Sequence, residues 1–112
     1  MQPPKKTPPW KYLEEALSYN EATGDMTWRT RPSSHFTKEW VCQSWNTRYA
    51  GKPALASVGR QGYATGAIDG VIYQAHRIIW KLVTGNEPDT IDHINGVRSD
   101  NSWNNLRAVT WR

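Results

Sequence analysis

Residues 91–107 read IDHINGVRSDNSWNNLR, and this stretch contains the strongest indications of fold and function in the chain. An aspartate and a histidine, Asp92 and His93, stand just before the turn-forming pair Asn95-Gly96. The stretch holds four asparagines, whose amide side chains can hydrogen-bond backbone groups and fix the shape of a loop. A carboxylate and an imidazole beside such a loop form an arrangement suited to chemistry.

The flanks of this stretch predict two paired strands. We expect a short strand at 91–93 and a second strand at 106–110 that pairs back with it. Adjacent strand residues normally point to opposite faces, so Asp92 and His93 can act on one substrate group only if the strand ends or bulges there. The Asn95-Gly96 pair that follows is consistent with such a break.

The string Asp-His-Ile-Asn-Gly, followed by Asp-Asn and then Asn-Leu-Arg, closely resembles the central motif of the HNH, or His-Me finger, endonucleases. The likeness is strongest to the phage and intron-homing branch. It is dense over residues 76–107 and loose from about residue 19, where a Glu-Ala-Thr-Gly-Asp pattern precedes Thr-Trp. The resemblance implies a nuclease or nickase that hydrolyses DNA phosphodiester bonds with a divalent metal ion, Mg²⁺ or Mn²⁺.

The resemblance also implies roles for single residues. Phosphodiester hydrolysis needs a base that deprotonates water and a cation that neutralises the leaving oxygen. Histidine titrates near neutrality, and His93 is implied as the general base beside Asp92 as a metal ligand. Asn105 is implied to tie the loop to the backbone near the histidine, and Asp100 and Asn101 are expected to brace the same loop.

One part of the family pattern is missing. In this branch the second strand is followed by a helix, announced by Thr-x-x-Glu-Asn, that supplies a second metal ligand. The sequence ends at Arg112, where that helix is expected to begin. We therefore expect a ββα metal finger truncated before its helix, either as a fragment of a longer nuclease or as a degenerate copy. Metal affinity is then expected to be weak, because Asp92 provides a single carboxylate.

The middle of the chain is basic. Between Met26 and Lys81, eight basic residues stand against Glu39 and Asp69, in a chain of net charge +4. Aromatic residues are interleaved with these cations, which suits contact with a DNA backbone and equally suits a solvated basic surface above an aromatic core. The candidate DNA contacts are Arg29, Arg31, Lys52, Arg60, His76, Arg77, Arg98 and Arg107. For His76, a structural or DNA-facing place on a helix is favoured over metal binding.

The overall pattern predicts a small α+β domain over residues 10–112, behind a flexible Pro-rich segment at 1–9. An N-terminal helix and a second helix are expected with a small antiparallel sheet, which the second helix covers. The expected elements are a helix at 8–18 capped by Thr7, a strand at 26–31, a loop at 32–51 with at most one helical turn, strands at 52–58, 63–68 and 71–74, and a helix at 75–84 ended by Gly85. Asp69-Gly70 is the strongest hairpin signal, because a primed turn requires positive φ.

Several other classes of function are disfavoured. Cys42 is the only cysteine, so no disulfide can form within the chain, and the sequence lacks a signal peptide or an apolar run long enough for a membrane span. A calcium loop counted from Asp92 would need glycine where Val97 stands, and the scattered histidines do not form a structural zinc pattern. We expect a cytoplasmic protein, a monomer without a small-molecule cofactor. It either cuts DNA, binds DNA without cutting, or is an inert fragment.

Overall fold

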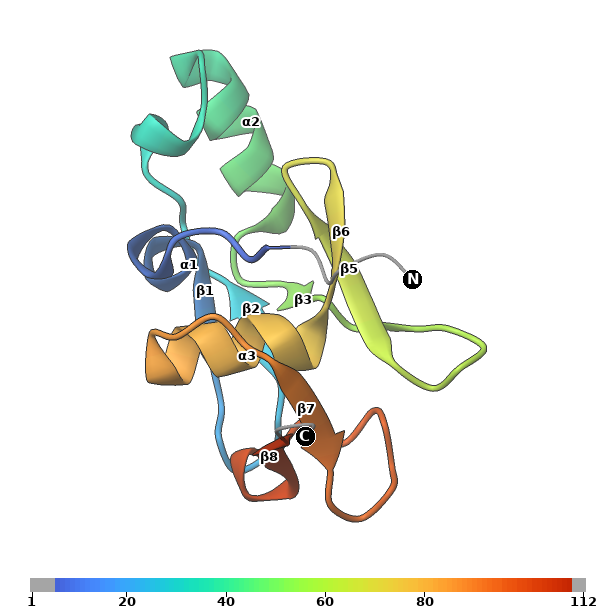
Figure 1. Ribbon diagram of the computed structural model, residues 1–112. Coiled ribbons are helices and arrows are strands. Elements are labelled where there is room, and N and C mark those ends of the chain that lie inside the picture. The colour runs from blue at the N-terminus through green and yellow to red at the C-terminus, as the bar shows by residue number, and fades with distance from the viewer. Residues whose placement is uncertain (1–5, 110–112) are drawn as a thin grey trace.

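The computed structural model describes residues 6–109, and within them the expected α+β class is confirmed (Figure 1). Three antiparallel sheets are found, where one small sheet and the separate two-stranded finger were expected; their strand orders are β1-β2-β3, β4-β5-β6 and β7-β8. The helices are α1 (Trp10–Ala16), α2 (Glu39–Tyr49) and α3 (Ala75–Thr84), and short 3-10 turns occur at Ser33–His35 and Trp103–Asn105. The strands are β1 (Leu17–Tyr19), β2 (Met26–Trp28), β3 (Pro53–Ala54), β4 (Ser57–Val58), β5 (Ala64–Ile68), β6 (Val71–Gln74), β7 (Thr90–His93) and β8 (Leu106–Val109).

Helix α3 crosses the middle of the molecule and organises the core (Figure 1). Its bounds agree with the sequence prediction, and Gly85 ends it in the left-handed conformation at φ 76°. Ile78 and Ile79 of α3 are fully buried together with Leu13 of α1 and Leu17 of β1. Because these four side chains lie in one cluster with Leu106 of β8, α3 links the N-terminal helix and strand to the C-terminal finger formed by β7 and β8.

The hairpin between β5 and β6 is also confirmed. Asp69 and Gly70 have φ values of 51° and 82°, as a primed turn requires. The preceding segment at 52–58 differs from the prediction, because Leu55, at φ 50°, separates β3 from β4 and sends them to different sheets.

The N-terminal segment departs from expectation at Thr7. Helix α1 begins at Trp10, and no side chain caps it. Thr7 is 5% exposed, and both its backbone N and its Oγ1 donate hydrogen bonds of 2.7 Å to the carboxylate of Glu87. Residues 6–9 are therefore attached to the loop after α3, whereas residues 1–5 of the expected flexible segment lie outside the described residues.

The expectation of a loop at 32–51 is wrong, because helix α2 occupies residues 39–49. Its apolar residues follow no clear helical stripe, so tertiary contacts hold it. Trp45 meets the Trp28 ring edge-on at 5.0 Å. The Asn46 amide accepts a hydrogen bond from the backbone N of Arg31 and donates one to its carbonyl oxygen, at 2.8 and 2.9 Å.

Arg31 was expected to face DNA from a basic strand, and the structure corrects this. Strand β2 ends at Trp28, and Arg31 lies beyond it with only 2% of its surface exposed. Its Nη2 is 3.0 Å from Asp69 Oδ1, and its guanidinium lies 4.7 Å from the ring centroid of Trp45. Because the charged group is enclosed and paired, it cannot contact a phosphate.

Within residues 6–109, no helix is long and apolar enough to cross a membrane.

Candidate active site

The finger of β7 and β8 places Asp92 and His93 on opposite faces. The strands pair in regular antiparallel register, with Asp92 opposite Arg107 and His93 opposite Leu106. The strand does end at His93, as expected, but the ladder contains no bulge that would turn the two side chains together. Asp92 therefore pairs across the ladder with Arg107, whose Nη2 is 2.8 Å from Asp92 Oδ2, while the His93 ring faces the interior.

The imidazole of His93 is held by one amide. Its Nε2 lies 2.8 Å from Oδ1 of Asn101, and both side chains are buried, His93 with 7% of its surface exposed. An amide oxygen only accepts hydrogen bonds, so Nε2 carries a proton and Nδ1 of the neutral ring keeps its lone pair. No described residue hydrogen-bonds Nδ1 of His93. The ring is therefore fixed through Nε2, and Nδ1 is its lone-pair nitrogen.

The loop between the strands is fixed by its own polar side chains. Asn105 accepts from the backbone N of Asn95 at 2.9 Å and donates to the carbonyl oxygen of Asp100 at 2.8 Å. The Asp100 carboxylate accepts from Ser102 Oγ and from Asn95 Nδ2, both at 2.8 Å. Hydrogen bonds from Ser102, and then from Asn95, hold the pKa of Asp100 below its ordinary value. The loop that carries Asn101 is thus braced across its width.

His76 lies behind His93 in the interior. The two rings meet edge to face, with centroids 4.9 Å apart, and His76 is 5% exposed. Its Nδ1 is fully enclosed and has no hydrogen-bond partner among residues 6–109. Burial, and then the nearby His93 and Arg77, lower the pKa of His76 to about 4. His76 is therefore neutral at pH 7, and its position gives it no surface for the DNA contact that the sequence suggested.

Arg98 and His93 both lie near the ring of Tyr63. The Arg98 guanidinium sits 5.0 Å from the ring centroid of Tyr63, and Tyr63 lies 6.1 Å from His93 between centroids. Arg98 Nη1 also donates to the carbonyl oxygen of Gln61 at 2.9 Å, next to the exposed Arg60. Two loops far apart in sequence therefore bring basic side chains to the region of the imidazole.

The other candidate DNA contacts are more dispersed. Arg77 donates to the carbonyl oxygens of Pro88 and Asp89, and Arg107 is engaged by Asp92. Arg29 and Lys52 are exposed at the β1-β2-β3 sheet, where Arg29 Nε donates to the Leu17 carbonyl oxygen. The structure thus places Arg98 beside Gln61, the sequence neighbour of Arg60, and leaves the remaining candidate cations on other parts of the chain.

Comparisons with known proteins find a match for the segment that contains this site. Residues 73–112 match the family model described as HNH endonuclease. This segment is therefore similar to the HNH endonucleases. A search of curated protein sequences found no match.

Among solved structures, the HNH segment and the residues before it resemble a chain reported under "DNA binding and cleavage by the HNH homing endonuclease I-HmuI". The identity is 21% and the TM-score 0.54, over 95% of this chain and 52% of that chain. The chain therefore spans about half the length of the protein it matches, and the match shows a shared fold.

The HNH segment offers a metal ion one suitable ligand. The Asp92 side chain is 42% exposed and presents oxygen, which Mg²⁺ prefers. No group of three or more His, Cys, Asp or Glu residues within 6–109 could hold a metal ion together. Mg²⁺ is often bound by only one or two protein carboxylates, with water and substrate phosphates as its other ligands. A single carboxylate such as Asp92 is compatible with a site of this kind.

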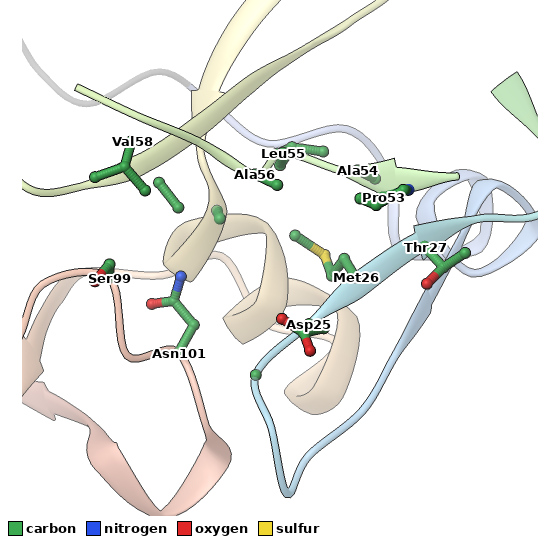
Figure 2. A pocket seen from close by; sticks show the side chains of 13 residues that line it. Asp25, Met26, Thr27, Pro53, Ala54, Leu55, Ala56, Val58, Ser99 and Asn101 are labelled. Carbon is green, nitrogen blue, oxygen red and sulfur yellow. The ribbon is translucent and has the colours of Figure 1, made fainter. Parts of the chain in front are cut away.

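The loop between β7 and β8, residues 94–105, is called the HNH loop below. A pocket of about 510 Å³ lies behind it (Figure 2). Asn101 and Ser99 line it from the loop before β8, Asp25 and Met26 line it from the β1–β2 hairpin, and residues 53–58 form another wall. Its lining is largely apolar and includes Asp25 but no basic side chain of the described residues. A phosphate therefore has no basic side chain to pair with in this pocket.

Sequence reasoning missed the part played by the β1–β2 hairpin. Tyr19 Oη donates to the carbonyl oxygen of Asn101 at 2.5 Å, and the backbone N of Trp103 donates to the Glu21 carbonyl oxygen at 2.9 Å. The only available signal was the Glu-Ala-Thr-Gly-Asp pattern at 21–25, which indicated kinship but not what the hairpin contacts.

Proposed function

We propose that this chain is a metal-dependent DNA endonuclease or nickase in which His93 is the general base. The observation that carries the proposal is the hydrogen bond between His93 Nε2 and Asn101 Oδ1, which leaves Nδ1 as the lone-pair nitrogen of the ring. The HNH family match over residues 73–112 supports the choice of phosphodiester chemistry over other uses of an oriented imidazole.

In the proposed reaction, His93 Nδ1 takes a proton from the water that attacks the scissile phosphate. Asn101 holds the ring in the tautomer that this requires, and Asn105 holds the loop behind Asn101 through bonds to Asn95 and Asp100. These residues gain their effect from orientation, because a misplaced base loses much of the advantage of proximity.

Substrate binding is proposed to use the cations around the ring. Arg98 and Arg60 are proposed to bind phosphates near the scissile bond, since guanidinium groups pair well with phosphate oxygens. A DNA phosphate competing for Arg107 would free Asp92 from their ion pair. Asp92 would then hold a divalent ion, which would supply charge neutralisation at the leaving oxygen.

A plasmid-nicking assay tests this proposal. The full chain is incubated with supercoiled plasmid and Mg²⁺ or Mn²⁺, and we expect nicked product that disappears in His93→Ala. His35→Ala is the control, because it also removes a partly buried, hydrogen-bonded histidine, but one that contacts Arg31 and Glu15 in the N-terminal part of the molecule. Equal nicking by the wild type and His93→Ala would exclude His93 as the base.

A DNA-binding module that cannot cut is the second candidate. Two observations favour it: Asp92 and His93 lie on opposite faces of the finger, and Asp92 is already paired with Arg107. In this case the same experiment gives a salt-sensitive gel shift of duplex DNA with no nicking at any metal concentration.

A further inference from the structure

The turn between β1 and β2, residues 20–25, packs directly against the loop that holds His93. Gly24 has a φ of +85°, and a Cβ atom built on it would lie 2.5 Å from both the carbonyl carbon of Asn101 and the backbone N of Ser102. Both neighbours are backbone atoms, which cannot swing aside as a flexible side chain can. Any side chain at this position must therefore displace the backbone at Asn101.

Two hydrogen bonds fix the same stretch of loop from the hairpin. Tyr19 Oη donates to the Asn101 carbonyl oxygen, and Trp103 N donates to the Glu21 carbonyl oxygen, at 2.5 and 2.9 Å. Burial, and then the nearby Glu21 and Asp100, raise the pKa of Tyr19 to about 12, so the hydroxyl remains a donor at neutral pH. The hairpin thus holds residues 101–103 through one hydrogen bond at Asn101 and one at Trp103, in addition to the Gly24 contact.

The turn is rigid enough to transmit this constraint. Asn20 Oδ1 accepts from the backbone N of Ala22 at 3.0 Å and of Thr23 at 3.3 Å. Gly24 N donates to the Asn20 carbonyl oxygen at 2.8 Å. Because the turn satisfies its own backbone groups, it presents a fixed surface to the HNH loop.

We propose that the β1–β2 hairpin is a positioning element for the general base: Gly24 and Tyr19 fix the backbone of Asn101, and the Asn101 side chain fixes Nε2 of His93. The hairpin lies outside the segment that matches the HNH family model, so the site is assembled from two distant parts of the chain. This inference rests on the proposed function for its catalytic consequence, but the orientation of the His93 ring can be measured without DNA.

The test uses two variants of the full chain, each with a matched control. Gly24→Ala pushes a methyl group into the Asn101 backbone, and Gly70→Ala imposes the same unfavourable φ, +82°, at another hairpin turn where nothing lies within 4 Å. Tyr19→Phe removes only the hydroxyl that bonds Asn101. Tyr12→Phe removes a hydroxyl that is likewise hydrogen-bonded, to Asp69 and Arg31, but away from the HNH loop.

Two readouts are compared across these proteins. Long-range proton–nitrogen NMR at pH 8 reports the tautomer of His93, and single-turnover nicking at saturating DNA reports the chemical step. We expect the Nε2–H tautomer to dominate in the wild type and both controls, and to lose population in Gly24→Ala and, to a smaller degree, in Tyr19→Phe. The nicking rate should fall about 10-fold or more in Gly24→Ala with DNA affinity unchanged, because small misplacements of a catalytic group carry large rate penalties.

Each outcome decides a different question. If Gly24→Ala and Tyr19→Phe match their controls in both tautomer and rate, the hairpin has no positioning role while the nuclease proposal stands. If the wild type does not nick DNA, the nuclease proposal fails, and the tautomer measurement still decides whether the hairpin orients the ring. Should Gly24→Ala fail to fold, Tyr19→Phe against Tyr12→Phe gives the same decision.

Discussion

Arg31 shows how tertiary packing changes the role of a single side chain. Its place among basic and aromatic residues indicated a DNA contact, yet the guanidinium is enclosed by the Trp45 and Phe36 rings, at 4.7 and 4.8 Å from their centroids, and paired with Asp69. A buried arginine needs such partners because an unpaired buried charge is costly. Arg31 is buried in the core and Arg60 is exposed at the surface, although both were predicted to contact DNA from the same basic and aromatic sequence pattern. Local sequence does not distinguish the two cases.

The lowered pKa of His76, again a property of a single residue, predicts that the stability of the fold depends on pH. Its pKa is about 4 in the folded chain against an ordinary 6.5, so the unfolded chain binds the proton first as pH falls. The stability that neutral His76 contributes is present above pH 6.5 and is lost as pH falls towards 4. Between pH 7 and pH 4.5 the loss should be on the order of 2 kcal/mol.

Urea unfolding of the wild type and His76→Leu at these two pH values checks this. We expect the variant to lose less stability on acidification than the wild type, by about the amount stated, because leucine does not titrate. Above pH 7 the two proteins should show parallel pH dependence. An equal loss in both proteins on acidification would contradict a depressed pKa at His76.

At the scale of elements, hydrogen bonds from the side-chain amides of its own asparagines fix the shape of the HNH loop. Asn105 is buried and makes two hydrogen bonds through its side chain, whereas its neighbour Asn104 is exposed. Asn105→Asp keeps an acceptor for Asn95 N but places a carboxylate oxygen against the Asp100 carbonyl oxygen. We expect a loss of roughly 1–3 kcal/mol in the free energy of unfolding, the cost of an unmade buried hydrogen bond.

The adjacent Asn104→Asp is the matched control for this change. It makes the same chemical substitution on the exposed side of the same 3-10 turn, and should change stability by less than about 0.5 kcal/mol. Denaturant unfolding of both variants gives the comparison. Similar losses at the two positions would mean that the added charge, and not the lost hydrogen bond, governs the effect.

Elements with strong local signals were predictable, and those held by distant contacts were not. Helix α3 follows from its apolar stripe and Gly85, and the β5–β6 turn from Asp69-Gly70. Helix α2 lacks such a stripe and exists because Trp45 and Asn46 find partners around Trp28 and Arg31. Within the candidate site, the loop asparagines were recognisable, but the Gly24 contact depended on a fold that brings residues 20–25 to residue 101.

At the scale of the whole molecule, the fold separates two basic regions. The molecule is elongated, and α2 lies at the end opposite the β7–β8 finger (Figure 1). Arg60 and Arg98 lie on the loops near His93, whereas Arg48 lies on α2. If DNA binds at the finger, these exposed arginines should contribute unequally to affinity even though their charges are equal.

Salt dependence of DNA binding tests this arrangement. Each phosphate contact contributes about −0.9 to the slope of log affinity against log salt concentration, so Arg60→Ala should make the slope shallower by about 1. Arg48→Ala removes the same charge from the far end and should leave the slope unchanged. Fluorescence anisotropy of labelled duplex DNA over a salt series gives both slopes, and a larger effect from Arg48→Ala would move the DNA-binding face to α2.

The sequence by itself determined the α+β class, the α3 helix, the β5–β6 and β7–β8 hairpins and the HNH motif, because each depends on neighbours within a few residues or on a motif of fixed spacing. Only the tertiary structure decided that Arg31 is buried, that α2 is a helix, and that the β1–β2 hairpin holds the backbone of Asn101. The physical reason is that these features follow from contacts between residues far apart in the chain, whose energies exceed the local preferences that a sequence displays.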